Sequence, residues 1–530
     1  MHRARRASAG ATDGGLIVAT LANQQWVTKA ETPQPTSSMI DDLEPTYREI
    51  FGSALIALWF VIGMGAMPGY EDWINTIGLV AFSILLAWAG YRQMKLNVAS
   101  LWTPMLWYRV ALLSYFGIGS MVPIWVNADT QELMKGFYSY FGYEIVKLNA
   151  VETIFNLIFL STIKLLFMSL RSGSIRKAFP SNSNRKYISP SNFNMIVFGS
   201  MCLIVGSAVN YFIIFPQIVG WINLTFFSTL ANLSVLSWLG YFMVIFWGLD
   251  NKRREFIVWP IALALGESVI GFYSMSKSVM LMPLVMISIA FIYHRRSLLR
   301  ISIFAGAFVS LFMFLSPIIT HVRDVNGQYY NGAASVRDIP SLYLSYFTTG
   351  QESDQFADVE TGWMRLSFVN AGTFAINQYD HGAPGSSYRY WSIVWIPRVI
   401  YPNKPIITDV AREMSYAANG NYNSSSSAGL AAEAYWNGGW VATVGIAIFL
   451  ALVFGLWSIY SYEVIQRKAW HLFFIVLIGM RMAIRVDGAF VSDILGPIAL
   501  VILAHIALEL MNRFLPRALA GVMRRTSAQA

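Results

Sequence analysis

The chain has 530 residues, of which 55% are apolar and 15% are aromatic, and its mean hydropathy is +0.49. Only 13% of the residues are charged, compared with about 25% in soluble domains. This composition excludes an ordinary soluble protein and a disordered chain, and a single cysteine, Cys202, excludes a disulfide scaffold.

Residues 1–50 are polar and rich in Ser, Thr and Pro, so we expect a disordered cytoplasmic tail. Beyond it, windows of about 20 mostly apolar residues predict nine membrane spans within 51–319 and three more within 437–511. We therefore predict an all-α polytopic membrane protein with about twelve transmembrane helices. Because the ends of the apolar windows are not sharply defined, the count ranges from eleven to fourteen. The windows lie near 51–68, 73–90, 105–126, 150–170, 193–215, 224–247, 256–273, 276–294, 301–319, 437–461, 469–484 and 488–511.

The basic residues near the ends of these spans alternate in number between the two sides of the membrane. With the N-terminus placed inside, inner segments, which include the basic tail 512–530, contain 24 of the 38 Lys and Arg residues, outer segments contain 11 and spans contain 3. Positive residues favour the cytoplasmic side. We expect both termini in the cytoplasm, and we interpret the net charge of +9 as a topology signal rather than a nucleic-acid surface.

Residues 320–436 form a large periplasmic loop in this topology. A loop of that length usually has a function or a structure of its own. Two segments, 363–379 and 390–399, combine aromatic and apolar side chains with few charges. We expect both to form amphipathic helices at the membrane interface.

The sequence IPRVIYPNKP at 396–405 places Arg398 and Lys404 among three prolines. Prolines hold a backbone extended, so the two cationic side chains are presented on a stiff segment. Such a segment suits a diphosphate ligand. An interfacial turn whose Arg and Lys contact lipid phosphates explains the same residues equally well.

Titratable residues lie at both ends of the large loop. THVRD places His321 and Arg323 just beyond the ninth span, and GLAAEAYWNGGW places Glu433 about one turn before the tenth. A carboxylate or an imidazole there can act as a general base. An interfacial salt bridge or a helix N-terminal acid is the alternative for Glu433, and a hydrogen-bonded interface histidine is the more ordinary explanation of His321.

Further charges lie near the ends of the predicted helices. Arg481 and Arg485 are four residues apart and share a helical face, with Asp487 just beyond them. Lys277 lies in the short outer turn between the seventh and eighth spans, and Arg109 near the inner end of the third is expected to be an inner-leaflet anchor. Charges inside spans mark sites by default, whereas Lys and Arg near span ends also reach lipid phosphates.

The sequence contains no pattern that supports a metal or a nucleotide cofactor. The acidic run QESDQFADVE at 351–360 has no constraint on its geometry, so we interpret it as a solvated loop. Walker, dinucleotide-binding, G-x-S-x-G and H-E-x-x-H motifs are absent from the sequence. We therefore expect a protein without a metal or another cofactor.

Four segments give the chain a resemblance to a known family. They are YSMSKSVMLMPL at 273–284, His321-Val322-Arg323, PRVIYPNKP at 397–405 and the Gly-rich, Glu-containing GLAAEAYWNGGW at 429–440. With the long outer loop and the three closing helices, they resemble the bacterial oligosaccharide repeat-unit polymerases, the O-antigen polymerase (Wzy-type) superfamily. The resemblance covers roughly 273–487, and the N-terminal half agrees with the family only in being polytopic.

The resemblance implies a GT-C-like architecture in the bacterial inner membrane and a glycosyltransferase that acts on the periplasmic face. Its donor and acceptor would be oligosaccharides linked to undecaprenyl diphosphate, polymerised into O-antigen or exopolysaccharide for the cell envelope, with a chain-length regulator as a further partner. Because such a donor carries its own leaving group, no metal is required. Glu433 is then the expected base, with His321 as second choice. The expected diphosphate ligands are Arg323, Arg398, Lys404, Arg481, Arg485 and Lys277, and the expected substrate contacts are Tyr401, Tyr435 and Asp487.

Three other functions fit parts of the same pattern. A ligase that attaches finished polymer to a lipid or protein would use the same donor chemistry. A lipid-phosphate-sugar glycosyltransferase would place an acid in the first outer loop, where Glu71 and Asp72 lie. A flippase for the same lipid-linked glycan would need ionisable residues near the middle of the membrane and interrupted, repeated helices.

Overall fold

The computed structural model is helical: every regular element in the described part of the chain is a helix. The described residues are 37–65, 68–126, 128, 131, 143–172, 195–222, 232–295, 298–330, 334–348, 363, 366–396, 401, 403–405, 407, 410–419, 427–466, 469 and 472–502.

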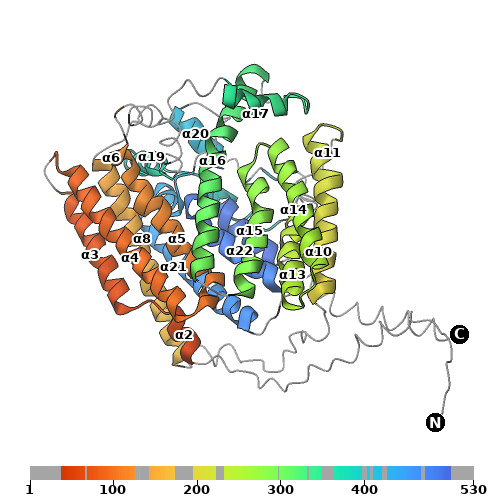
Figure 1. Cartoon of the computed structure of the whole chain (residues 1–530). Coiled ribbons are helices and arrows are strands. Elements are labelled where there is room, and N and C mark those ends of the chain that lie inside the picture. Colours follow the sequence, from red (N-terminus) through yellow and green to blue (C-terminus); the bar gives the residue numbers. More distant parts are fainter. Residues whose placement is uncertain are drawn as a thin grey trace, which may run out of the picture.

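The helices before the large loop form two groups, with one long helix standing in front between them (Figure 1). The left-hand group comprises α2 (Ser37–Leu43), α3 (Tyr47–Gly63), α4 (Glu71–Leu96), η1 (Val98–Trp102), α5 (Pro104–Leu112), the π-helical η2 (Leu113–Ile118), η3 (Gly119–Met121), α6 (Val122–Trp125) and α8 (Tyr143–Arg171). The right-hand group comprises α10 (Met195–Val209), the π-helical η5 (Asn210–Ile214), α11 (Phe215–Ile218), η6 (Asn232–Ser234), α13 (Val235–Asp250), α14 (Glu255–Tyr273) and α15 (Lys277–His294). The helix between the groups is α16 (Leu298–Tyr330).

The large loop and the closing helices complete the fold. The loop contains α17 (Ile339–Thr348), α19 (Val369–Asp380), η8 (Ser387–Tyr390) and α20 (Val410–Asn419). The closing elements are α21 (Leu430–Gln466), α22 (Phe473–Ile484), η11 (Arg485–Asp487) and the π-helical η12 (Phe490–Leu495). α21 packs against α8 and α22 packs against α5, so these two closing helices contact the left-hand group.

Local sequence explains where several helices begin and how closely they pack. Thr46 Oγ1 accepts a hydrogen bond from the backbone N–H of Glu49 at 3.1 Å and so caps α3, and Pro104 occupies the first turn of α5. α10 and α13 approach through glycine: a Cβ on Gly206 would lie 2.0 Å from the backbone N of Ser237. Small residues allow such backbone contact between helices in a membrane.

Eight helices in the described residues are long and apolar enough to span a membrane, fewer than the twelve predicted spans. Three further apolar helices, α13, Val279–His294 and Phe490–Ile502, coincide with predicted spans but are shorter, and α22 has only 12 residues. The eight are Ile40–Gly63, Glu71–Leu96, Pro104–Trp125, Tyr143–Arg171, Met195–Ile218, Glu255–Tyr273, Leu299–Arg323 and Leu430–Gln466. The transmembrane, all-helical character is therefore confirmed, while the number twelve and a GT-C-like architecture remain predictions.

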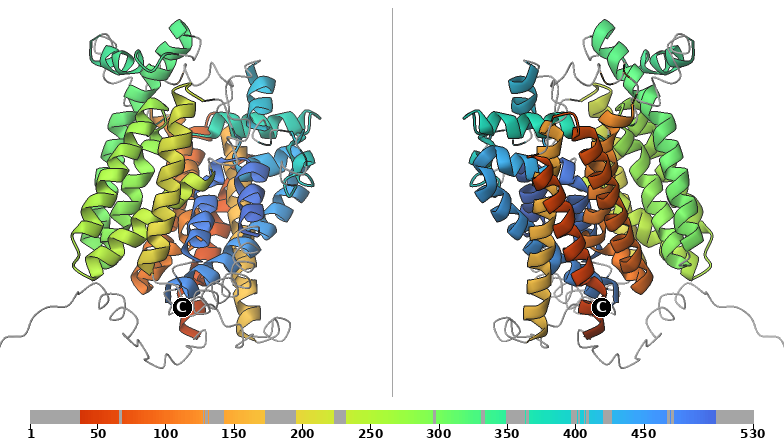
Figure 2. Two further views of the ribbon diagram at one scale, coloured as in Figure 1. Left: turned by 90° about the vertical axis from the view of Figure 1, so that its right-hand side faces the viewer. Right: turned by 90° about the vertical axis from the view of Figure 1, so that its left-hand side faces the viewer.

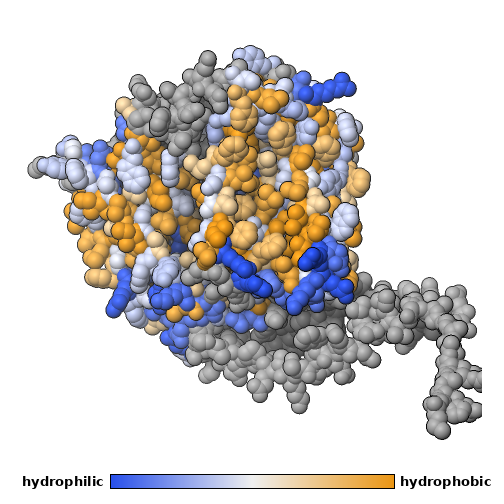
Figure 3. All heavy atoms as spheres, viewed as in Figure 1, coloured by the Kyte–Doolittle hydropathy of each residue, from blue (hydrophilic) through white to orange (hydrophobic). Residues whose placement is uncertain are grey.

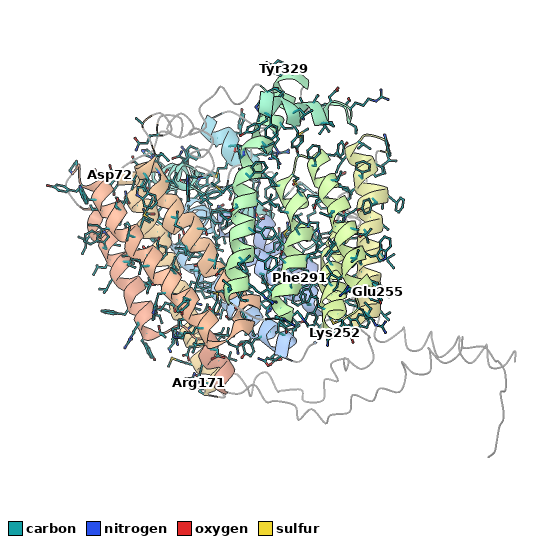
Figure 4. All side chains as sticks on the ribbon, viewed as in Figure 1. Asp72, Arg171, Lys252, Glu255, Phe291 and Tyr329 are labelled. Atoms are coloured by element: carbon teal, nitrogen blue, oxygen red, sulfur yellow. The ribbon has the colours of Figure 1, made fainter. Side chains whose placement is uncertain are left out.

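The two ends of the helical bundle differ in the residues that they present. Arg171, Lys252 and Glu255 lie at one end, and Asp72 and Tyr329 lie at the other (Figure 4). Apolar side chains cover the middle of the face in Figure 3, and hydrophilic ones gather along its lower edge. α17 projects beyond the upper end of the bundle in both side views (Figure 2). The described helices of the large loop therefore lie at the same end of the bundle as Asp72 and Tyr329.

Several predicted boundaries need correction. Helix begins at Ser37, so 37–50 does not belong to a disordered tail: Lys164 Nζ in α8 lies 2.6 Å from Glu44 Oε1 just after α2. α16 continues to Tyr330 although the loop was predicted to start at 320, because backbone hydrogen bonding continues after the apolar side chains end. The amphipathic segment 363–379 is represented by α19, which packs on α8 and α21, and 390–399 forms turns up to residue 396, beyond which it lies outside the described residues.

Arg109 is also placed differently from the prediction. It is buried in α5, where its Nη2 lies 2.8 Å from Glu49 Oε1, and it donates to Gln93 of α4 as well. Arg109 therefore joins three helices inside the protein instead of anchoring to the inner leaflet.

Candidate functional site

Charged side chains gather where α21 begins and where α22 ends. α21 leads away from the large loop and α22 returns toward it, so the η11 turn comes back to the first turn of α21. Glu433 lies in that first turn, and Arg485, Asp487 and Asp493 lie on the returning segment. We call these four residues the acidic junction, because it contains three carboxyl groups and one guanidinium group.

Glu433 is buried, with 2% of its surface exposed. Its Oε1 accepts a hydrogen bond from Ser387 Oγ at 2.6 Å, and its Oε2 accepts one from the backbone N–H of Phe490 at 2.6 Å. Asn437 Nδ2 donates to the same Ser387 Oγ at 2.8 Å, and Asn437 Oδ1 accepts from the backbone of Tyr388 at 3.3 Å. Glu433 thus ties η8, α21 and η12 together, which favours a positioning role for a residue that we predicted as the base.

Arg485 is paired with two carboxylates. Its Nε lies 3.2 Å from Asp493 Oδ1, and its Nη1 lies 3.8 Å from Asp487 Oδ2. When all four groups are ionised, the acidic junction has a formal charge of −2. This environment does not suit the diphosphate-binding role that we predicted for Arg485, because its positive charge is already compensated.

Asp487 combines burial with an unused acceptor. Only 7% of its surface is exposed, and its Oδ1 is buried without a hydrogen-bond partner among the described residues. Burial raises the pKa of Asp487 to about 6; Arg485 opposes this shift and Asp493 reinforces it. The turn is held by Asp493 Oδ2, which accepts from the backbone of Ala489 at 3.0 Å, and a Cβ on Gly488 would lie 2.5 Å from that same oxygen.

A second set of predicted residues lies around the turn between α14 and α15. Lys277 Nζ donates to Ser316 Oγ at 2.6 Å, and Arg323 Nε donates to the carbonyl of Met275 at 2.8 Å. His321 Nε2 lies 3.1 Å from Ser345 Oγ. We call Lys277, His321 and Arg323 the basic cluster. These named partners are uncharged, so the guanidinium charge of Arg323 is not compensated by its bond to Met275.

The basic cluster is built on helices rather than on loop ends. His321 and Arg323 lie inside α16, not beyond its end as predicted, and Lys277 is the first residue of α15. Met275, which joins the two helices, has a φ of +50°, a left-handed conformation that non-glycine residues rarely adopt. α14 rises from Glu255, so the turn lies at the same end of the bundle as α17 and α19 (Figures 1 and 4).

Two of the remaining predicted cations, Lys404 and Arg481, lie in the described residues. Lys404 Nζ donates to the carbonyls of Val394 and Ile396 at 2.9 and 3.0 Å, so it joins two parts of its own loop. Arg398 lies outside the described residues. Arg481 is exposed on α22, and Tyr401 is exposed in the loop.

Tyr435 belongs to a separate polar contact. Its hydroxyl donates to Asp380 Oδ1 at 3.0 Å, and Asp380 Oδ2 pairs with Lys147 of α8. The Lys147 ammonium also lies 5.4 Å from the centre of the Tyr435 ring. This contact fixes the end of α19 against α8 and α21.

The sequence analysis did not predict several residues of the candidate site. Asp493 lies in a predicted span, and a charge there marks a site by default, so the signal was present. Ser387 and Asn437 carry no such signal, because Ser and Asn are ordinary in loops and helix ends. Their role depends on long-range contact with Glu433.

The part of the chain that the structure describes contains no group of three or more His, Cys, Asp or Glu residues able to hold a metal ion. The acidic run 351–360 lies outside it. Comparisons with family models, with curated protein sequences and with solved structures gave no match.

Proposed function

We propose that the chain is a membrane-embedded glycosyltransferase that polymerises lipid-diphosphate-linked oligosaccharides at the outer face of the bacterial inner membrane. The observation that supports this most is the presence of a basic cluster and an acidic junction at the loop end of the helical bundle. Transfer from a lipid diphosphate benefits from positive charge beside the leaving group and from a base beside the acceptor hydroxyl. The resemblance to the O-antigen polymerases points to the same chemistry.

The basic cluster is the proposed site of the donor diphosphate. Arg323 can present a planar fork to phosphate oxygens, and Lys277 adds a point charge. Lys277 also begins α15, where the helix dipole favours a negative ligand. Beside a bilayer, whose dielectric constant is lower than that of water, such charges would stabilise the leaving diphosphate more than they would in bulk solvent.

The acidic junction is the proposed site of the acceptor hydroxyl. It presents carboxyl groups without a net positive charge, which suits a neutral sugar better than a phosphate. A positioned carboxylate base typically contributes about 100-fold to 10,000-fold in rate. In this proposal the basic cluster stabilises the leaving group and the acidic junction activates the nucleophile.

The test is to incubate the purified full-length protein, in lipid nanodiscs, with an undecaprenyl diphosphate oligosaccharide. A ladder of products that each differ by one repeat unit supports the proposal. A single transfer to a different acceptor indicates a ligase. Recovery of unchanged substrate, with no transfer to any sugar or lipid acceptor, contradicts glycosyl transfer.

One observation favours a second candidate, a flippase. Glu267 in α14 is buried and accepts hydrogen bonds from Ser207 and Ser237 at 2.9 and 3.0 Å, and Glu152 in α8 is buried as well. Ionisable residues within spans are what a transport pathway requires. Proteoliposomes with a fluorescent lipid-linked glycan distinguish the functions, because a flippase moves the lipid between leaflets without lengthening the glycan.

A further inference from the structure

We infer that Asp487 accepts the proton of the attacking sugar hydroxyl, while Glu433 holds the turn of Asp487 in place. The inference rests on the proposed function and assigns the base within it. Asp487 and Glu433 both belong to the acidic junction, but they receive different roles because their oxygens have different contacts.

The hydrogen bonds of Glu433 and Asp487 support different roles for the two residues. Both oxygens of Glu433 already accept from protein donors, Ser387 Oγ and the Phe490 N–H. Asp487 has one buried oxygen, Oδ1, with no partner among the described residues, although 93% of the residue is buried, given its 7% exposure. A buried acceptor without a donor is destabilising, because it has lost its hydrogen bonds to water. A substrate hydroxyl would supply the missing donor.

The surroundings of Asp487 suit a base that works near neutral pH. The groups that face it are Arg485 of η11, Asp493 of η12 and Tyr115 of η2. Burial raises its pKa to about 6, so Asp487 is ionised at pH 7 and still close enough to that pH to take up a proton. Both η2 and η12 are π-helical, a conformation that is frequent at functional sites.

In the proposed transfer, the acceptor hydroxyl displaces the lipid diphosphate from the donor sugar. The acceptor O–H bond breaks and its proton moves to Asp487 Oδ1. The oxygen lone pair forms a bond to the anomeric carbon of the donor. The bond from that carbon to the diphosphate oxygen breaks, and its electron pair leaves with the lipid diphosphate. Asp487 then releases the proton to solvent.

The test compares full-length wild-type protein with D487N, D487E and D493N in the polymerisation assay across pH 4.5–8. Wild-type kcat should rise about tenfold per pH unit up to about pH 6 and then level off, because the base must be ionised. D487N should lose at least about 100-fold in kcat with little change in the KM for the donor, and its residual rate should lack the acidic limb. D487E should retain that limb at a lower rate.

The matched control is D493N, which removes the neighbouring charge that raises the pKa of Asp487. Its acidic limb should therefore move to lower pH. A D487N protein that elutes as a monodisperse species yet keeps more than one tenth of wild-type kcat overturns the inference and leaves the proposed function standing. If D487N does not fold, a pH profile of D487E that lacks the acidic limb of the wild-type protein overturns it. A wild-type protein that makes no product overturns both.

Discussion

At the scale of single residues, Glu433 connects parts of the chain that are far apart in sequence. Ser387 lies 46 positions before it and Phe490 lies 57 positions after it, and both donate to its carboxylate. A buried carboxylate that accepts two hydrogen bonds fixes both donors. The loop segment at η8 and the returning segment at η12 therefore depend on one side chain.

We expect Glu433→Gln to lower the free energy of unfolding by about 1–3 kcal/mol, because the amide presents an NH₂ group to one of two donors. Thermal unfolding of the purified protein in detergent measures the effect. The control is Glu255→Gln, whose side chain is 55% exposed and whose change should stay within about 0.5 kcal/mol. Equal stability of the two variants would mean that the Glu433 hydrogen bonds contribute nothing.

Arg323 allows a test of the basic cluster. Arg323→Lys keeps the charge but loses the Nε that donates to Met275 and the planar fork, so we expect a loss of about tenfold to 100-fold in polymerisation. Product formation per folded protein is the measurement. Arg253→Lys at the opposite end of the bundle is the matched control and should retain full activity. Full activity in Arg323→Lys would remove this residue from the donor site.

The sequence predicted the types of residue at the site better than their environments. Lys277, Arg323 and Glu433 do lie at the loop end of the helices, where hydropathy and charge placed them. The contacts of Lys404 could not be predicted, because its binding to the Val394 and Ile396 carbonyls depends on how the loop closes in three dimensions. Asp493 could have been found, since it was a charge inside a predicted span.

At the scale of elements, the kink in α21 separates its first two turns from the long apolar part. Gly438 and Gly439 have non-helical backbone angles, and Gly439 has a φ of +57°, which favours glycine. A Cβ on Gly439 would lie 2.6 Å from the Tyr379 hydroxyl. The kink therefore allows the segment with Glu433 to take its own direction toward η8.

We expect Gly439→Ala to destabilise the protein by at least about 1–2 kcal/mol, from the left-handed backbone alone, and to displace Tyr379. Gly445→Ala, six residues later in the same helix, meets no atom within 4 Å and should stabilise the protein by about 0.5–1 kcal/mol. Thermal unfolding of both variants in one detergent checks the opposite signs. Two stabilising changes would contradict the kink.

The elements were predicted well where hydropathy defines them and poorly where it does not. The apolar windows identified most helices, but they ended α16 at 319, although the helix continues to Tyr330. Helical hydrogen bonds within the backbone do not require apolar side chains, so a drop in hydropathy marks the end of a span and not the end of a helix. His321 and Arg323 were therefore predicted as loop residues.

At the scale of the whole molecule, the two ends of the bundle provide a test of orientation. Asp72 lies at the end of the loop helices, and Arg254 lies beside Lys252 and Glu255 at the other (Figure 4). Because positive residues favour the cytoplasm, we expect Asp72→Cys to react with an impermeant maleimide in intact cells and Arg254→Cys to react only after permeabilisation. The native Cys202 is buried and should give little background. The reverse labelling pattern would invert the topology.

The fold class of the whole molecule was predictable from the sequence, but the number of membrane spans was not. Composition and hydropathy identified an all-helical membrane protein, because a bilayer requires apolar helices whatever their packing. The number twelve depended on four segments, among them α13 and α22, whose helices in the described residues are too short to count as spans by length alone. The length of a helix depends on neighbouring segments that a hydropathy window does not weigh.

The length of α16 also determines how far Arg323 lies from the lower end of the helical bundle. Its 33 residues rise about 1.5 Å each, so the helix is about 50 Å long, whereas the hydrocarbon core of a bilayer is about 30 Å thick. Arg323 follows Leu298 by 25 positions, which places it about 38 Å from the lower end of the helix. A helix that enters the membrane near Leu298 therefore delivers Arg323 to the layer of lipid headgroups, where the phosphates of a lipid carrier lie. In this placement the length of α16 determines the depth of Arg323. Removal of one turn between Leu298 and Pro317 would lower Arg323 and His321 toward hydrocarbon without deleting any residue of the basic cluster.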